Sequence, residues 1–421
     1  MTSHLSWKPG RTALAGLTAG ALIGATLLAA GPANAAAPVQ GNDDSGQPAI
    51  SADGRFVAFA SYATNLVPGD TNGSQDVFVR DRMTSTTTRV SVSSGGQQGN
   101  HVSARPSISA DGRFVAFISL AANLVPGDTN GKLDDFVHDR ATGTTTRVSV
   151  SSAEVQGNDE STFEAPAISA DGRYVAFASY ASNLIGPGKD YPYSSDVFMR
   201  DRVRGVTTRV SVTDTGAAIA DTSTPSISSD GQVVSFVSRH ATPDSPEVTS
   251  AYVRDRAAGR TVLVGEDAAA CGGATYDPQV SPDGRFVLRL LWRNNCSAQV
   301  GLLVRTDWRS GVSKRRVVWR STDPGYFPNQ AAQSADGSRA VYADRASLPG
   351  APVVIYEWNT GRSTTLRIGQ AGAYDVAMSA DGRSIAVETA AGLTADDTNA
   401  PVADVYVWTP DQNLVRRVSV G

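Results

Sequence analysis

The chain has 421 residues, of which 41% are hydrophobic, and its 37 basic and 41 acidic residues give a formal net charge of −4. This length allows a large buried core, and one repeat that runs to the last residue favours a single large domain over two or three. The acidic balance and the absence of a basic block with interleaved aromatic residues argue against nucleic acid as a partner.

Residues 1–35 have the features of an export signal. Lys8 and Arg11 precede an apolar stretch at residues 13–30, and Ala33-Asn34-Ala35 offers the small residues that a signal peptidase requires. A membrane anchor is the alternative, which the glycines inside the apolar stretch disfavour. Loss of Lys8 and Arg11 with the signal would change the net charge from −4 to −6. We therefore expect a secreted or extracytoplasmic protein with no membrane span after cleavage.

From residue 43 onward, the phrase Ser-Ala-Asp-Gly or a close variant of it returns seven times. The seven phrases begin at Ser51, Ser109, Ser169, Ser228, Ser281, Ser334 and Ser379. They are 45 to 60 residues apart, a period typical of supersecondary units that stack because none can bury its own faces alone. Residues 36–42 form a short segment before this array, which we expect to span residues 43–421.

Each repeat is expected to contain four strands. In the first repeat they are predicted at residues 47–50, 55–61, 76–80 and 86–92. The Asp-Gly pair between the first two runs is typical of a hairpin turn, and the runs themselves are β-branched and aromatic. Four antiparallel strands per period is the plan of a β-propeller blade. The sequence therefore predicts an all-β fold, a single seven-bladed β-propeller of four-stranded antiparallel blades. An open solenoid is the alternative, disfavoured because neither end carries a polar capping unit.

The loop between the second and third strands is the best candidate for chemistry. In the first two repeats it reads Asn-Leu-Val-Pro-Gly-Asp-Thr-Asn-Gly before an Asp that opens the third strand, and the seventh repeat echoes it. The oxygen-bearing residues are Asp70, Asn72, Asp76, Asp128, Asn130, Asp134, Asp397, Asn399 and Asp404. Such oxygens at alternate positions suit calcium, although no bidentate Glu closes the loop. The same residues also form turns without metal, by bonding their own backbone. We favour the turn, expect no cofactor, and treat these residues as candidate binding groups, with calcium as the alternative.

Cys271 and Cys296 are the only cysteines. In an exported chain, two cysteines suggest a disulfide. If Asp283-Gly284 is a two-residue turn, residues that face each other across the hairpin have numbers that sum to 567, as these two do. The sequence thus predicts a Cys271–Cys296 bridge, with free thiols or metal ligands as the alternative.

The repeat phrase also indicates a family. Pro-x-Ile-Ser-Ala-Asp-Gly-Arg-(Phe/Tyr)-Val-Ala-Phe, at residues 48–59, 106–117 and 166–177, resembles the TolB-like propeller repeat of exported bacterial proteins. The resemblance covers nearly all of the chain after residue 43. It implies a propeller that binds partners through loop surfaces, and it transfers no catalytic residue. The sequence shows no counterpart of the N-terminal α/β domain of the translocation protein, so the outer-membrane role of that protein is not implied here.

Sequence motifs of common enzyme classes are missing, including the Gly-x-Ser-x-Gly elbow, His-Glu-x-x-His and the phosphate-binding loop. We therefore expect a secreted, monomeric, non-enzymatic binding or scaffolding module. Its expected partner is a protein or glycan of the cell envelope or medium, bound through the face that carries the long loops. The alternative is an extracellular carbohydrate-active enzyme, a lyase or hydrolase, that uses loop carboxylates with or without a metal.

Overall fold

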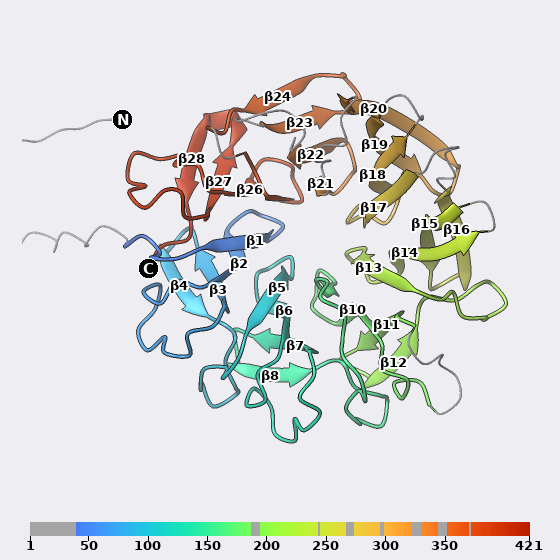
Figure 1. The fold of residues 1–421 in the computed structure, drawn as a ribbon, viewed down its shortest axis with the longest axis horizontal. Helices are drawn as coiled ribbons and strands as arrows, with labels where there is room; N and C mark the ends of the chain where they lie inside the picture. Colours follow the sequence, from blue (N-terminus) through green and yellow to red (C-terminus); the bar gives the residue numbers. More distant parts are fainter. Residues whose placement is uncertain are drawn as a thin grey trace, which may run out of the picture. The chain divides into compact units, whose positions relative to one another are not determined.

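The computed structural model describes residues 39–421, apart from 187–193, 243–244, 267–272, 295–298, 322–329, 344–351 and 370–371. The chain divides into the units Met1–Ala37 and Pro38–Gly421, and the described residues belong to the second. Within them, seven four-stranded antiparallel sheets stand around a central channel (Figure 1). No helix in this part of the chain is long and apolar enough to cross a membrane.

Each sheet is one blade and is built from one continuous segment of chain. Blades 1 to 4 contain β1 (Ser45–Ile50), β2 (Phe56–Ser61), β3 (Asp76–Asp81), β4 (Thr86–Arg89), β5 (Ser103–Ile108), β6 (Phe114–Ser119), β7 (Asp134–Asp139), β8 (Thr144–Arg147), β9 (Ala167–Ile168), β10 (Tyr174–Ser179), β11 (Asp196–Asp201), β12 (Val206–Arg209), β13 (Thr222–Ile227), β14 (Val233–Thr242), β15 (Ser245–Asp255) and β16 (Arg260–Glu266). Blades 5 to 7 contain β17 (Gly273–Val280), β18 (Phe286–Asn294), β19 (Gln299–Asp307), β20 (Val312–Ser321), β21 (Ala331–Gln333), β22 (Arg339–Ala343), β23 (Val353–Glu357), β24 (Ser363–Leu366), β25 (Asp375–Met378), β26 (Ile385–Thr389), β27 (Asp404–Thr409) and β28 (Leu414–Arg417), with the 3-10 helix η1 (Pro410–Gln412) before the last strand. The predicted seven-bladed propeller is confirmed.

The Ser-Ala-Asp-Gly phrase folds through contacts between its own residues. In blade 1, Ser51 Oγ donates to Asp53 Oδ1 at 2.7 Å and accepts from the Phe56 amide at 2.9 Å. Asp53 Oδ1 also accepts from the amide of Arg55 at 2.9 Å, and Gly54 adopts a φ of +72°. Because this turn needs only neighbouring residues, it forms in the same way in each repeat.

The seven turns are also bonded to one another around the channel. The Ala52 amide donates to the Ala110 carbonyl at 3.1 Å, and equivalent bonds continue from blade to blade until the Ala380 amide donates to the Ala52 carbonyl at 3.1 Å. Pro282 has no amide hydrogen, and the Asp283 amide donates to the Ala335 carbonyl instead, at 3.2 Å. The backbone therefore closes a complete ring on this face, which we call the turn face.

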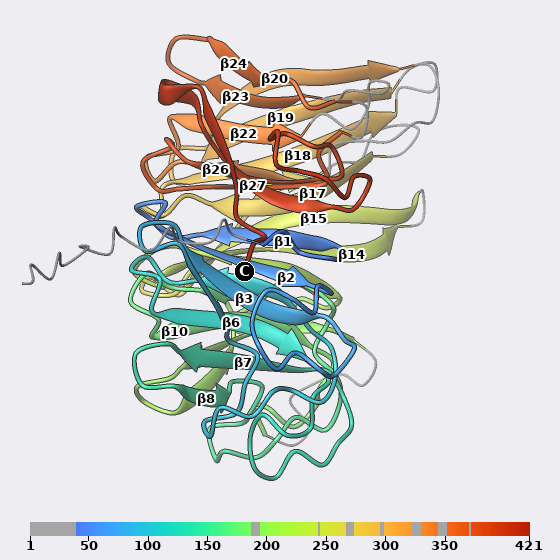
Figure 2. The ribbon, with the colours of Figure 1, turned by 90° about the vertical axis from the view of Figure 1, so that its left-hand side faces the viewer.

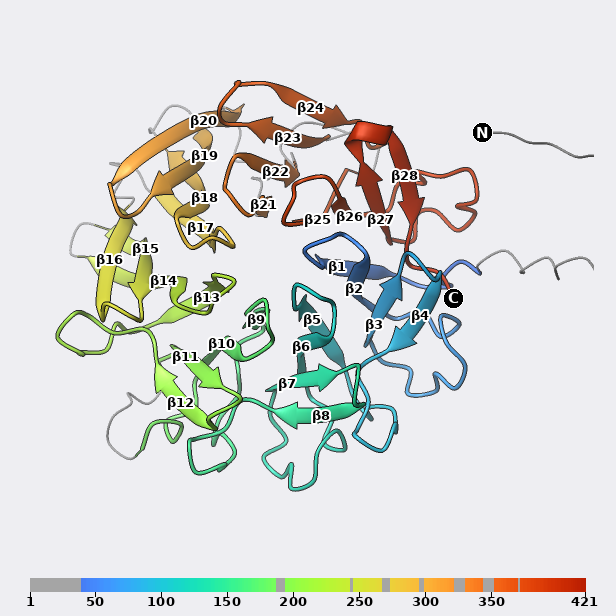
Figure 3. The ribbon, with the colours of Figure 1, turned by 180° about the vertical axis from the view of Figure 1, so that it is seen from behind.

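The opposite face, which we call the long-loop face, carries the loops between second and third strands and the linkers between blades. Figure 2 shows the strands from the side, running between the two faces. A linker pairs with the blade before it through the bridge between Val92 and Gln98. Between blades 7 and 1 the same bridge joins Val420 to Gln40, beside the C-terminus (Figure 3). The N-terminal segment thus takes the place of a linker, and no blade combines strands from both ends of the chain.

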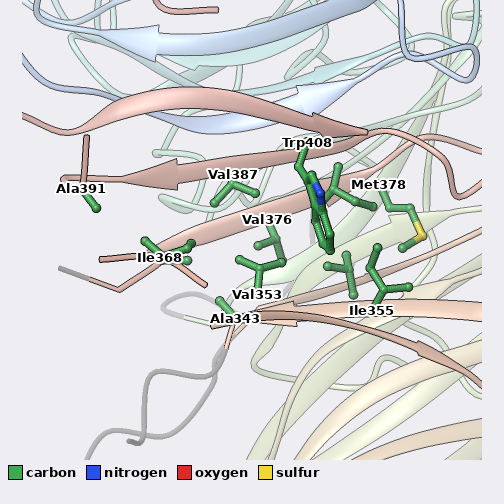
Figure 4. Close-up of a cluster of buried hydrophobic side chains, with 12 residues drawn as sticks. Ala343, Val353, Ile355, Ile368, Val376, Met378, Val387, Ala391 and Trp408 are labelled. Atoms are coloured by element: carbon green, nitrogen blue, oxygen red, sulfur yellow. The ribbon is translucent and has the colours of Figure 1, made fainter. Parts of the chain in front are cut away.

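Hydrophobic clusters lie between neighbouring blades, which explains the apolar runs of strands buried on both faces. Figure 4 shows the cluster in which Val353 and Ile355 of blade 6 meet Val387 and Trp408 of blade 7. Each blade therefore depends on its neighbours for its core.

The register of blade 5 differs from the expected one. Val280 faces Val287, as predicted, but a bulge shifts the pairing so that Gly273 faces Arg293. The numbers of facing residues then sum to 566, so the register from which we predicted the disulfide is wrong beyond the bulge. Cys271 and Cys296 lie outside the described residues, and their bridge stays a prediction.

Candidate binding site on the long-loop face

The acidic loop of blade 1 folds around the side chain of a glutamine from the next linker. Gln98 Nε2 donates to Asp70 Oδ1 at 2.9 Å and to Asp76 Oδ2 at 2.7 Å. Arg89 Nη1 lies 3.4 Å from Asp70 Oδ1 and 3.3 Å from Asp76 Oδ2, while Asn72 Oδ1 accepts from a backbone amide two residues on. Burial raises the pKa of Asp76, and the donors around it oppose that shift. The predicted residues do converge, and the amide of Gln98 lies at the point of convergence.

Blade 2 repeats this arrangement. Gln156 Nε2 donates to Asp128 Oδ1 at 3.0 Å and to Asp134 Oδ2 at 2.9 Å. Arg147 Nη1 lies 3.0 Å from Asp134 Oδ2, and Asn130 Nδ2 donates to a linker carbonyl at 3.0 Å. Both carboxylates are buried among protein donors rather than presented to solvent.

In blade 7, the glutamine comes from the N-terminal segment. Gln40 Nε2 donates to Asp397 Oδ1 at 2.8 Å, to Asp404 Oδ2 at 2.9 Å and to Asn399 Oδ1. Arg417 Nη1 lies 3.7 Å from Asp397 Oδ1. No group of three or more His, Cys, Asp or Glu side chains that could hold a metal ion occurs among the described residues. That these loops bind a ligand or calcium stays a prediction.

A ring of polar side chains inside the channel was not anticipated from the sequence. They line a cavity of about 150 Å³ and come from all seven blades: Gln47, Arg105, Glu164, Thr224, Asp277, Gln330 and Asp375. We call this ring the channel collar. In four blades a bulge in the innermost strand, at a residue with positive φ before a proline, interrupts the alternation of the strand. The repeated x-Pro pair in the first strand was the available signal.

The channel collar holds more acidic than basic side chains. Burial raises the pKa of Asp277 to about 7 and the pKa of Asp375 to about 8, and the charge of Arg105 opposes both shifts. Glu388 raises the pKa of Asp375 further, and its Oε2 accepts from the Gln47 amide at 2.8 Å. Among the described residues that line this cavity, Arg105 is the one basic side chain.

A larger cavity, of about 640 Å³, opens beside the channel collar and shares Glu164 with it. Its lining comes from strand ends and loops of blades 2, 3 and 4 on the long-loop face, and includes Leu120, Leu133, Glu160, Ser161, Phe163, Tyr180, Asp221 and Arg239. We call it the blade 3 cavity. Its volume lies within the range of small-molecule and side-chain pockets.

Blade 3 departs from the repeat at this cavity by two additional residues. Ser161 and the turn residue Ser169 are eight positions apart, whereas the equivalent serines of blades 1 and 2 are six apart. The longer segment contains Phe163 and Glu164, and the inner strand is reduced to Ala167–Ile168. Phe163 is consequently 54% exposed.

A second departure concerns a pair of serines. In blade 1, Ser45 Oγ and Ser61 Oγ share a hydrogen bond of 2.8 Å, and blade 2 has the same pair. In blade 3, Ser161 still bridges Ser179 through the backbone. However, Ser161 Oγ is buried with no hydrogen-bond partner among the described residues, and Ser161 is only 2% exposed.

A third departure places a carboxyl group in an apolar position. Asp135 of blade 2 stands where blades 1 and 3 have Val77 and Val197, and it is 1% exposed. Burial raises the pKa of Asp135 to about 8, and the nearby hydroxyl of Ser161 opposes the shift without forming a regular hydrogen bond. Asp135 Oδ2 has no hydrogen-bond partner in the described part of the chain. Its signal in the sequence was Asp-Asp where the sister repeats have Asp-Val.

Three departures from a regular repeat thus surround one cavity. Local exceptions to an otherwise consistent pattern are expected where a protein has a functional site, because they cost stability without helping the fold. The blade 3 cavity is therefore the best candidate site on the long-loop face.

Known proteins resemble this chain in structure and not in sequence. The sequence matches no protein-family model and no curated protein. The structure is similar to oligogalacturonate lyase from Vibrio parahaemolyticus, with a TM-score of 0.56 and 12% identity over 90% of this chain and 92% of that chain. It is also similar to the β-propeller domain of the Trilobed protease from Pyrococcus furiosus, with a TM-score of 0.55 and 11% identity over 90% of this chain and 96% of that chain.

TolB from Acinetobacter baumannii also matches, with a lower TM-score of 0.42 and 14% identity over 88% of this chain and 81% of that chain. At these identities, the comparisons support a propeller and no activity. The TolB-like assignment stays a prediction from the repeat phrase.

Proposed function

We propose that this chain is an exported, monomeric, non-enzymatic binding module of the TolB-like propeller type. It recognises a protein or glycan of the cell envelope or medium through its long-loop face. The observation that carries this proposal is the blade 3 cavity of about 640 Å³, which is formed where the repeat is broken. Loops held by a rigid scaffold are where recognition surfaces commonly lie.

The aromatic lining supports recognition of a partner. Phe163 is 54% exposed and Tyr180 is 38% exposed, and both line the cavity. Aromatic side chains that combine a large apolar surface with little conformational entropy are common anchors at binding sites.

An extracellular carbohydrate-active enzyme is the second candidate, because one similar structure is named as an oligogalacturonate lyase. In this chain, however, the predicted loop carboxylates Asp70 and Asp76 already contact Arg89 and Gln98. A general acid or base must instead be free to reach its substrate. This observation favours the binding module.

The test is retention of envelope proteins and of a glycan panel on the immobilised chain, compared with two variants. Tyr180→Ala removes an aromatic side chain of the cavity, and Tyr62→Ala removes its counterpart in blade 1, which is 47% exposed. We expect saturable binding that Tyr180→Ala weakens and Tyr62→Ala preserves. Equal binding by all three proteins, or turnover of a glycan by the wild type, would contradict the proposal.

A further inference from the structure

We propose that the blade 3 cavity takes a cationic group, namely the ammonium or guanidinium of a lysine or arginine side chain on a partner protein. The inference rests on the proposed binding function and names the chemistry that its site selects.

The charges around the cavity favour a cation. Glu160, Glu164 and Asp221 line it together with one basic residue, Arg239. Arg105 and Arg239 both act on Glu164, so these guanidinium groups compensate that carboxylate first. The carboxylates of Glu160 and Asp221 have no ion pair or side-chain hydrogen bond within the described residues. The carboxylates of Glu160 and Asp221 are therefore left for a ligand. With Arg105 and Arg239 counted, the five charged side chains carry a net charge of −1, which favours a cation over an anionic ligand such as a uronic acid polymer.

Buried polar atoms at the cavity also favour a ligand with a positive charge. Ser161 lines the cavity, and its buried Oγ, which makes no hydrogen bond of regular geometry within the described residues, lies near the carboxyl of Asp135, whose Oδ2 also has no such partner. Buried polar groups without partners are uncommon in folded proteins, and each is costly unless a ligand or water satisfies it. A cation in the cavity would stabilise the ionised form of Asp135 by electrostatic attraction.

The aromatic residues provide surfaces for the stem and the head of such a side chain. The guanidinium of Arg105 already lies 5.4 Å from the centroid of the Phe163 ring. Tyr180, on the adjoining strand end, is 38% exposed and offers a second ring. Cations bind aromatic faces, and lysine and arginine stems pack on them through their methylene groups. Acidic rim, buried oxygens and aromatic surface together select a basic side chain over a neutral sugar.

The experiment is calorimetric titration of the full chain with trilysine. Acetylated trilysine, whose side chains are uncharged, is the matched ligand control, and chitotriose is the glycan probe. The site variant is Glu160→Gln/Asp221→Asn. The control variant, Asp43→Asn/Asp411→Asn, removes two exposed carboxylates elsewhere and keeps the net charge equal. Melting midpoints of all proteins are measured first, so that a misfolded variant is recognised.

We expect trilysine to bind the wild type and the control variant alike, and to bind the site variant about tenfold more weakly, with little heat from the other two probes. Equal weakening in both variants would indicate non-specific electrostatics and overturn the proposal. Binding of chitotriose or acetylated trilysine in place of trilysine would also overturn it and leave the binding function standing. Equal retention of envelope partners by the wild type, Tyr180→Ala and Tyr62→Ala would instead contradict the proposed binding function itself.

Discussion

The glycine of each Asp-Gly turn serves the neighbouring blade as well as its own turn. A Cβ on Gly112 would overlap the ring of Phe56 in the preceding blade, and the φ of Gly112 is +72°. The same ring has the guanidinium carbons of Arg55 and Arg140 each 4.6 Å from its centroid. The absence of a side chain at residue 112 therefore lets two blades close on a cation–aromatic stack.

We expect Gly112→Ala to lower the free energy of unfolding by about 3 kcal/mol, because it adds steric overlap to the cost of a positive φ. Gly127→Ala is the matched control, since Gly127 has a φ of +73° and open space around it. That variant should lose about 1 kcal/mol. Urea denaturation measures both, and equal losses would show that the contact with Phe56 contributes nothing.

Asp135 gives a prediction of pH dependence. Burial raises its pKa to about 8, well above the ordinary range of an aspartic acid, so the native state holds a proton that the unfolded state releases above about pH 4. The free energy of unfolding therefore falls as pH rises towards 8. Asp135→Val, which restores the residue of blades 1 and 3, removes this loss and should stabilise the protein by about 1–3 kcal/mol at pH 8.

The measurement is the difference in denaturation midpoint between Asp135→Val and the wild type across this pH range. Asp277 and Asp375 also have raised pKa values, so the difference between the two proteins is informative and the wild-type curve alone is not. A difference that stays constant from about pH 4 to pH 8 would mean that Asp135 is not protonated in the native state.

At the scale of elements, the sequence predicted those features that depend on contacts between residues close together in the chain. The turn of blade 1 needs only Ser51, Asp53 and their neighbours, so its hairpin could be read directly. Gln98, in contrast, reaches Asp70 from 28 positions away, and no local pattern reveals that pairing. The bulge at Asp277, which moved the register beneath the predicted disulfide, depends on the packing of an innermost strand around the channel.

The acidic loops yield a test of the contact that organises them. Gln98→Ala should lower the free energy of unfolding by about 1–3 kcal/mol, because it removes the amide that donates to both buried carboxylates, Asp70 and Asp76, and leaves the longer contacts with Arg89 as the ones that they share. Gln97→Ala is the control, since Gln97 is exposed and its side chain makes no hydrogen bond within the described residues. Thermal and urea denaturation of the two variants should separate clearly, and equal stability would assign the loop structure to Arg89 alone.

The contact of Gln98 with the acidic loop also predicts how calcium affects stability. Because the Gln98 amide lies where the oxygens of the loop converge, we expect the melting midpoint of the wild type to be the same in calcium and in chelator. A midpoint that rises with calcium concentration, and that Asp70→Ala and Asp128→Ala abolish, would contradict this expectation and assign the loops to metal binding.

At the scale of the whole molecule, the ring is closed twice without exchange of a strand between the chain ends. On the turn face, the bond from the Ala380 amide to the Ala52 carbonyl completes the backbone ring. On the long-loop face, Gln40 inserts between Asp397 and Asp404 as Gln98 does in blade 1. Each of the seven blades is formed by one continuous segment of the chain.

This closure makes the join between Val39 and Gly421 equivalent to an interblade linker, which leads to a prediction for a circular permutant. The Gly421 amide donates to the Val39 carbonyl at 2.8 Å, so a short Gly-Ser connection can span the two ends. New ends between Gly95 and Gly96 would fall in an exposed linker, where the bridge from Val92 to Gln98 would take over the role of the N-terminal segment. We expect the permutant to keep the circular dichroism spectrum and single unfolding transition of the unpermuted residues 39–421. Deletion of residues 39–42 should instead lower the midpoint, because Asp397 and Asp404 lose their shared donor. A permutant that unfolds in several steps would show that the bridge from Val92 to Gln98 does not substitute for a continuous linker.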